Sequence, residues 1–187
     1  MRVSRREARR AGLTVVEVVV AVVILAFLAA LMMPVMRGRM IAADAGALAS
    51  TLRSIRQGID SYREHTGWYP SSMFQLQFIP GSGDSPLTNS CGAAVAQAPL
   101  ANAWRGAYVA QRVGPEGMQV GAMTVSPDFT RLAVTGTAAY LGITVSEVPE
   151  PVANRVDEIF DGELSLTTGA ITWTNGTLTY HLPVLGC

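Results

Sequence analysis

Residues 9–40 read RRAGLTVVEVVVAVVILAFLAALMMPVMRGRM. A basic stretch ends at Gly12, and apolar residues then run almost unbroken from Leu13 to Met36, with Glu17 inside the run. A helix of this length, at about 1.5 Å per residue, is long enough to span a bilayer core of about 30 Å. The stretch therefore predicts a membrane-spanning helix over residues 13–36. An ionisable side chain inside such a helix usually marks a function.

Charge is distributed unevenly along the chain. Residues 1–12 carry five arginines and one glutamate, so they have a net charge of +4, whereas the whole chain has a formal net charge of zero. Basic flanks of apolar helices stay in the cytoplasm, which predicts that everything after Met36 lies outside. A secretory signal would have a shorter apolar core followed by a small-x-small cleavage site, and this sequence has neither. The rest of the chain has no large basic excess, so bulk affinity for nucleic acid is not indicated.

Together these features resemble the N-terminus of the type IV pilins and type II secretion pseudopilins, whose precursors carry a class III signal peptide. Gly12 matches the last residue of the family's leader, Leu13 the first mature residue, Glu17 the fifth and Pro34 the twenty-second. Most members have Phe where this chain has Leu13, but leader cleavage and N-methylation do not need that ring. The resemblance covers about residues 1–65 and is only architectural beyond them.

The resemblance implies how the precursor matures. A prepilin peptidase would remove residues 1–12 as a cytoplasmic leader and methylate the new amine of Leu13. The precursor would sit in the inner membrane, in the lipid bilayer, with its C-terminal domain outside. An inner-membrane assembly machinery would then build it, with copies of itself and other pilins, into a periplasmic pseudopilus or an extracellular pilus, in which residues 13–36 form the filament core.

The resemblance also implies a role for Glu17 in assembly. Its carboxylate would pair with the N-terminal amine of a neighbouring subunit. Two opposite charges attract strongly in a low dielectric and each is costly alone, so this pair would favour assembly in register. The plainer interpretation is a membrane anchor whose Glu17 side chain reaches the nearby interface. In that case the chain is an uncleaved bitopic membrane protein with a periplasmic binding module.

The second half of the predicted helix, residues 37–65, is amphipathic. Pro34 predicts a kink or a melted turn just before it, and Gly67 followed by Pro70 predicts the end of the helix. Between them, apolar residues recur at spacings of three and four and form one stripe: Ile41, Ala45, Leu48, Leu52, Ile55, Ile59 and Tyr62. We therefore expect one long helix over residues 13–64 that docks on a sheet through this stripe.

The remaining sequence predicts an α+β fold, in which the long helix packs on an antiparallel β-sheet as in pilins. Residues 66–105 are rich in Gly, Ser, Pro and Ala and are expected to form an irregular αβ-loop. Residues 106–187 should form the sheet region, with a short helix near 151–161. The expected strands are Tyr108–Arg112, Met118–Val125, Ile143–Val145 and a C-terminal hairpin around a type I′ turn at Asn175-Gly176, with Ile171 and Trp173 facing Leu178 and Tyr180.

Cys91 and Cys187 are the only two cysteines in the sequence. If the domain is exported, as the N-terminus predicts, they can form a disulfide, whereas in the cytosol they would remain free thiols. Pilins commonly carry a disulfide near the C-terminus, which fits a Cys91–Cys187 bond. In the chain-entropy model, closing a loop of about 97 residues stabilises the fold by roughly 4–5 kcal/mol. Two free thiols remain the alternative.

Three further groups of polar residues were considered as binding or catalytic sites. Four carboxylates within seven residues are Ca²⁺ candidates, but they lack the D-x-D-x-D-G loop pattern and fit a solvated helix end better: Asp157, Glu158, Asp161 and Glu163. Arg53, Arg56 and Arg63 form a weak candidate strip for DNA, and such residues more often face solvent. His65 and His181 lie near no nucleophile motif, and no cofactor motif is present, so we expect neither an enzyme nor a cofactor.

The sequence thus favours a structural, non-enzymatic subunit of a type IV pilus or a related filament. Within the family, the Gly67–Pro70 element is typical of pseudopilins, whereas the long αβ-loop and the terminal Cys187 are typical of pilins. A type II secretion pseudopilin or a minor pilin therefore remains an alternative at this stage.

Overall fold

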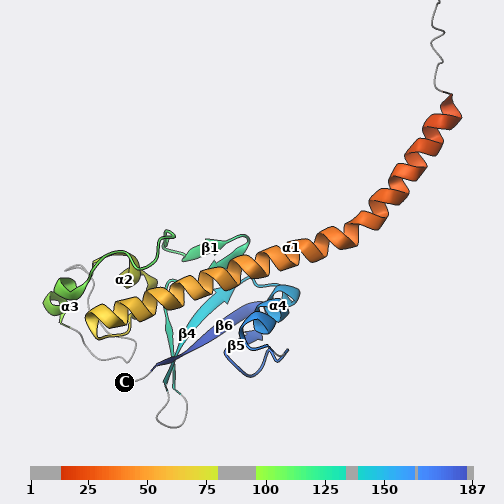
Figure 1. Ribbon diagram of the computed structural model, residues 1–187. Helices are drawn as coiled ribbons and strands as arrows, with labels where there is room; N and C mark the ends of the chain where they lie inside the picture. The colour runs from red at the N-terminus through yellow and green to blue at the C-terminus, as the bar shows by residue number, and fades with distance from the viewer. Residues whose placement is uncertain (1–13, 80–95, 134–138, 163, 185–187) are drawn as a thin grey trace, which may run out of the picture. The chain divides into compact units, whose positions relative to one another are not determined.

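The computed structural model describes residues 14–79, 96–133, 139–162 and 164–184. It divides into a first unit that ends at residue 40 and a second unit from residue 41 to the C-terminus. The described residues form an α+β fold with one long N-terminal helix and an antiparallel sheet (Figure 1). The elements, in chain order, are α1 (Val15–Thr66), α2 (Met73–Gln77), α3 (Gln97–Ala103), β1 (Met118–Val120), β2 (Met123–Val125), β3 (Thr130–Ala133), β4 (Ala139–Ser146), α4 (Glu150–Phe160), β5 (Ile171–Thr174) and β6 (Thr177–Val184).

Helix α1 is continuous, as the sequence predicts. Its backbone stays helical through Pro34, so the melted turn is not found, while the predicted kink stays a prediction. The helix ends where expected: Gly67 has a φ of +78°, and its N–H donates a hydrogen bond of 2.7 Å to the carbonyl oxygen of Arg63. A glycine adopts this left-handed conformation without the steric cost that a Cβ atom brings, which is why it serves as the C-terminal cap.

Strands β4 and β6 form the centre of the sheet. They pair antiparallel over nearly their whole length, from Ala139 opposite Val184 to Val145 opposite Leu178. The strand order is β1-β2-β4-β6-β5, and β3 pairs with the same edge of β4 as β2 does, but further towards the start of β4. All of these pairings are antiparallel, so the sheet can pack on one face and leave the other to solvent.

The C-terminal hairpin has the predicted turn and register. Asn175 has a φ of +49° and Gly176 a φ of +83°, the two positive values that a type I′ turn requires. Ile171 lies opposite Tyr180, and Trp173 lies opposite Leu178. The segment between β4 and α4 contacts this turn: the N–H of Val148 donates a hydrogen bond of 2.8 Å to the carbonyl oxygen of Gly176.

The segment predicted as one strand over Met118–Val125 is instead the two-stranded hairpin β1–β2. Val120 lies opposite Met123, and Gly121 occupies the first turn position with a φ of +62°. A glycine with positive φ in a two-residue loop closes a tight hairpin. The predicted segment thus has strand structure at both ends, and the turn at Gly121 divides it.

The strand predicted at Tyr108–Arg112 is wrong: this segment has no strand structure. Its backbone groups bond to α2 rather than to a neighbouring strand. The N–H of Tyr108 donates to the carbonyl oxygen of Leu76 at 2.7 Å, and the side-chain amide of Gln77 donates to the carbonyl oxygen of Gln111 at 3.1 Å. The same Gln77 accepts from the N–H of Val113 at 3.0 Å.

The connection over residues 66–105 is less irregular than predicted, because it contains α2 and α3. The Trp104 indole N–H, directly after α3, donates to the carbonyl oxygen of Gln75 in α2 at 3.1 Å. Met73 and Leu76 of α2 are buried in the core. The sequence also gave no prediction of β3, whose partner strand β4 lies beyond it in the chain.

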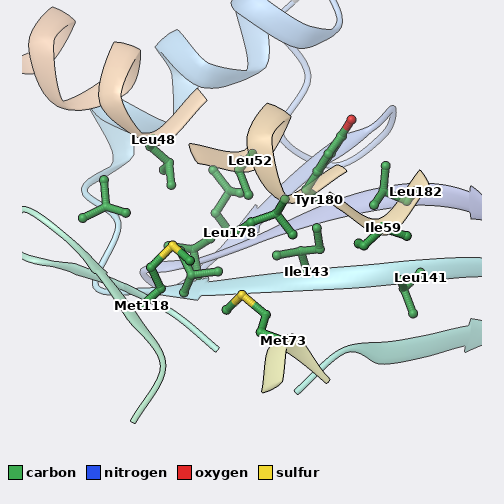
Figure 2. Packing of buried hydrophobic residues seen from close by; sticks show 14 of the residues in the cluster. Leu48, Leu52, Ile59, Met73, Met118, Leu141, Ile143, Leu178, Tyr180 and Leu182 are labelled. Atoms are coloured by element: carbon green, nitrogen blue, oxygen red, sulfur yellow. The ribbon is translucent and has the colours of Figure 1, made fainter. Parts of the chain in front are cut away.

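The core of the second unit lies between α1 and one face of the sheet (Figure 2). Six of the seven predicted stripe residues are buried, with 0–2% of their surface exposed, and Ile41 is half-buried and packs against the cluster. Alternate residues of β6 complete the packing: Leu178, Tyr180, Leu182 and Val184 are buried. Helix α4, predicted near 151–161, covers the same face, and its Phe160 ring lies 4.8 Å from the ring of Tyr180.

Gly58 allows a close approach of α1 to the segment around Tyr108. A Cβ atom at this position would lie 2.9 Å from the carbonyl oxygen of Tyr108 and 3.0 Å from Val109, whereas a Cβ atom at Gly46 would meet nothing within 4 Å. Both glycines belong to the helix segment that packs on the domain. They therefore form a matched pair that separates the effect of contact from the effect of helix propensity.

We predict that Gly58→Ala lowers the free energy of unfolding by about 1–3 kcal/mol, because overpacking forces the backbone apart. Gly46→Ala should raise it by up to about 1 kcal/mol, since Ala is the better helix former. Urea unfolding of the full chain in micelles, followed by tryptophan fluorescence, measures both. Equal effects of the two substitutions would contradict the close contact at Gly58.

Candidate functional site: an apolar helix with a capped start

The first part of α1, Val15–Met40, presents apolar side chains on every side. The residues described there are all exposed, and large side chains such as Leu25 and Phe27 keep 64% and 68% of their surface exposed. An exposed apolar surface that surrounds a whole helix needs a non-aqueous environment or a covering partner. By length and composition this segment is a candidate membrane span, and its place near the N-terminus also fits a signal sequence.

The Thr14 side chain caps the start of this helix by accepting a hydrogen bond. The N–H of Glu17 donates to the Thr14 hydroxyl oxygen at 3.2 Å, so Thr14 is the N-cap and Glu17 the third helical residue. Thr-x-x-Glu is the spacing of a capping box, in which the glutamate can also accept from the N-cap backbone. The cap is not among the features predicted from the sequence. Glu17 is exposed, and a carboxylate in the first turn also interacts favourably with the helix dipole.

The other predicted residues of the N-terminal site are described only in part. Gly12 and Leu13 lie outside the described residues, so the cleavage and methylation site stays a prediction. The backbone at position 34 is helical. Cys91 and Cys187 also lie outside the described residues, and their predicted disulfide stays a prediction.

The three arginines considered for DNA binding lie on α1, and each guanidinium group contacts the domain. Their contacts are aromatic: the Arg53 guanidinium lies 5.2 Å from the centre of the Phe160 ring, Arg56 donates to the Tyr180 hydroxyl at 3.2 Å, and the Arg63 guanidinium lies 4.8 Å from the centre of the Tyr69 ring. Such cation–π and hydrogen-bond contacts hold the helix in one rotational setting. DNA binding by these residues remains an untested prediction.

The acidic group at the end of α4 fastens the loop that follows it. Asp157 is completely buried, and its Oδ2 atom accepts a hydrogen bond of 2.7 Å from the N–H of Ser165. Asp161 accepts from the N–H groups of Ala170 and Ile171, at 3.1 and 3.0 Å, with one oxygen for each. The sequence interpretation of a solvated helix end is therefore wrong for Asp157.

The same group was the Ca²⁺ candidate. The Glu158 carboxylate forms an ion pair with Arg155, and Glu163 lies outside the described residues. Both Asp161 oxygens and one Asp157 oxygen accept backbone N–H groups, so Asp157 Oδ1 is the oxygen left open. In the described part of the chain, no three side chains of His, Cys, Asp or Glu gather where they could hold one metal ion.

Comparisons of this chain with protein-family models, with curated proteins and with solved structures found no match.

Asp157 should make the stability of the domain depend on pH. Burial is the main cause that raises the pKa of Asp157 above its usual 3.8, and the neighbouring Asp161 raises it further, while the hydrogen bond from Ser165 lowers it. The folded state thus favours the protonated acid. The stabilisation from this group is complete below the unfolded pKa and is lost as the pH rises through the raised pKa of the folded state.

We predict that Asp157→Asn removes this pH dependence, because the amide keeps the shape and the acceptor oxygen but does not ionise. At neutral to alkaline pH the variant should be more stable by about 1–3 kcal/mol, the usual cost of a buried polar group without a partner. Urea unfolding at a series of pH values measures this. Glu158→Gln, on the exposed side of α4, is the control and should retain the dependence. The same pH dependence in wild type and Asp157→Asn would refute the argument.

Proposed function

We propose that this protein is a structural subunit of a type IV pilus or a related filament, including a secretion pseudopilus. The observation that carries the proposal is that the apolar surface of α1 changes along its length. Its first part exposes apolar side chains on all sides, and its second part buries one stripe in an antiparallel α+β domain. Such a helix belongs to two environments at once, lipid or a helical bundle at one end and a water-soluble domain at the other.

The start of α1 supports the same proposal. A membrane anchor needs only apolar length, yet this helix begins with the capped sequence Thr14-Val15-Val16-Glu17 directly after the Gly12-Leu13 step. In the proposed subunit the leader is removed after Gly12, and Leu13 then carries a free and methylated amine. Because this amine and the Glu17 carboxylate of a neighbour have opposite charges, their pairing removes the cost that each has alone in an apolar core.

In the proposed pathway, the basic leader stays in the cytoplasm and the precursor spans the inner membrane, with the domain from residue 41 outside. The subunit then leaves the bilayer for the filament, and neighbouring copies of α1 replace lipid around its apolar part. The exchange requires little change in hydrophobic burial, because both surroundings are apolar. The protein acts as a building block and not as an enzyme.

Leader removal is the first test. We predict that protein purified from its own cells has the mass of a chain that starts at Leu13 with one added methyl group. Gly12→Leu should abolish this processing, since the peptidase must accept a residue without a side chain at the cut, while Ala8→Leu in the same leader should be processed normally. Intact-mass spectrometry of the three proteins measures this. A chain that begins at Met1 in all material would favour the uncleaved bitopic membrane protein and overturn the proposal.

The second test separates the two roles of Glu17, helix capping and intersubunit charge pairing. Glu17→Gln keeps a side chain that fits a capping box but removes the charge, whereas Thr14→Val removes the cap and keeps the charge. We predict that Glu17→Gln inserts in the membrane and is cleaved, but forms at least about tenfold fewer filaments, and that Thr14→Val assembles nearly normally.

Filament yield is measured on the sheared fraction by quantitative immunoblot and electron microscopy, and processing is measured on the membrane fraction. Thr14→Ser, which retains the capping hydroxyl, is the control for the Thr14 substitution. Wild-type filament yield from Glu17→Gln, combined with a loss in Thr14→Val, would show that Glu17 serves the helix start rather than a neighbouring subunit.

A further inference from the structure

The face of the sheet opposite the core bears a cavity of about 830 Å³. Along β6, Tyr180 and Leu182 are buried in the core, so the alternate residues His181 and Pro183 point to the other face. Tyr140 of β4 and Thr172 of β5 line the cavity beside them, and the loop 167–170 forms its remaining wall. The volume lies within the range of about 300–1,000 Å³ that is usual for small-molecule sites.

Hydrogen bonds to Asp161 and to β6 fix the loop 167–170, which forms one wall of this cavity. Ala170 uses both of its backbone groups: its N–H donates to Asp161, and its carbonyl oxygen accepts from the N–H of His181 at 2.7 Å. Gly169 has a φ of +105°, and a Cβ atom at this position would lie 2.5 Å from an oxygen of Asp161. The carboxylate at the end of α4 therefore fixes the loop at the position where it borders the cavity, and the site needs little ordering on binding.

The lining is mostly apolar by surface, and its hydrogen-bonding groups are uncharged. His181 Nε2 lies 2.8 Å from the Thr172 hydroxyl oxygen, and Thr167 and Thr168 add two further hydroxyl groups. Burial lowers the pKa of His181, partly offset by Asp161, and so favours the neutral ring. Among the described residues that line the cavity, none is an acid, an arginine or a lysine. Hydroxyl groups both donate and accept hydrogen bonds, which suits a ligand that carries hydroxyl groups itself.

Two rings contribute to the apolar part of this lining. The rings of Tyr140 and His181 lie 6.5 Å apart and are inclined at 80°, and Pro183 continues the apolar surface. A pyranose sugar has the complementary form, with an apolar face of C–H groups and a rim of hydroxyl groups. Charged ligands find no counter-ion in this lining. The Thr172 hydroxyl and the His181 ring already bond to each other, as the Thr168 hydroxyl does to Ser165, and each hydroxyl can form a further hydrogen bond to a ligand.

We propose that this cavity binds a neutral pyranose sugar, either free or as the terminal unit of a glycan. The ring of the sugar lies against Tyr140 and Pro183, and its hydroxyl groups bond to Thr172 and His181. This proposal does not depend on the filament role, because it rests only on the domain from residue 41 onward. A protein that never assembles would still bind the sugar.

The histidines provide a direct readout, because the chain contains only two. His181 lines the cavity, whereas His65 lies on α1 beside the Tyr108 hydroxyl, 3.1 Å from it, and serves as the internal control. The full chain, labelled in histidine, is studied by NMR in dodecylphosphocholine micelles, which carry no sugar headgroup. The probes are the methyl glycosides of glucose, galactose and N-acetylglucosamine, with glucuronate as the charged comparison.

We expect one or more of the neutral glycosides, at millimolar concentration, to shift the ring signals of His181 and to leave those of His65 unchanged. Cellobiose and lactose distinguish the two sources: a free-sugar site gains nothing from the second unit, and a glycan-end site binds the disaccharide more tightly. No shift of His181 with any neutral sugar, or a larger shift with glucuronate, would overturn the proposal.

Substitutions locate the binding. Tyr140→Ser removes the aromatic wall and should weaken binding about tenfold, the order of magnitude of a good aromatic contact. Thr172→Val, which keeps the shape and removes the hydroxyl, should also weaken it, whereas Thr179→Val on β6, which does not line the cavity, should not. Unchanged His65 signals show that each variant is folded. Wild-type affinity in both Tyr140→Ser and Thr172→Val would refute this site.

Discussion

The packing of one stripe of α1 on the sheet is the interaction on which the rest of the second unit depends. Six stripe side chains are almost fully buried against the inward residues of β4 and β6. Removing a buried Leu or Ile of this kind typically costs about 2–5 kcal/mol, a large part of the stability of a domain this size. Among the described elements, the short helices α2 and α4 also contribute buried residues to this core. The stripe of α1 runs along it, and this contact determines which sides of the hairpins face inward.

Much of this arrangement could be predicted from the sequence, because periodicity determines which face of an element is buried. The stripe from Ile41 to Tyr62 and the register of the C-terminal hairpin are confirmed by the structure. The predictions that were wrong concern segments whose structure depends on distant residues. The segment Tyr108–Arg112 resembles a strand, but Gln77 and Leu76, more than 30 residues earlier, bind its backbone groups. Contacts between distant segments leave no local pattern to recognise.

The candidate sites also fall into those formed by neighbouring residues, which the sequence can predict, and those formed by distant segments, which it cannot. The Thr14 cap is local, and its Thr-x-x-Glu spacing is visible in the sequence once a helix start is sought there. By contrast, the burial of Asp157 depends on the loop that folds back over α4 to donate the N–H of Ser165. A helix end with several acids resembles a solvated surface in sequence whether or not a loop covers it. The cavity beside His181 is also invisible in sequence, since three strands and this loop build it together.

The contact between α1 and the domain has a mechanical consequence. The buried positions from Ala45 to Tyr62 extend over about 26 Å of helix, at about 1.5 Å per residue. A pull along the axis of this segment loads all of these contacts in shear at the same time, together with the Arg53 and Arg56 contacts, instead of peeling them apart one by one. Interfaces loaded in shear resist rupture far better than those that are unzipped. The contact between this helix segment and the domain is therefore suited to resist force along the helix axis.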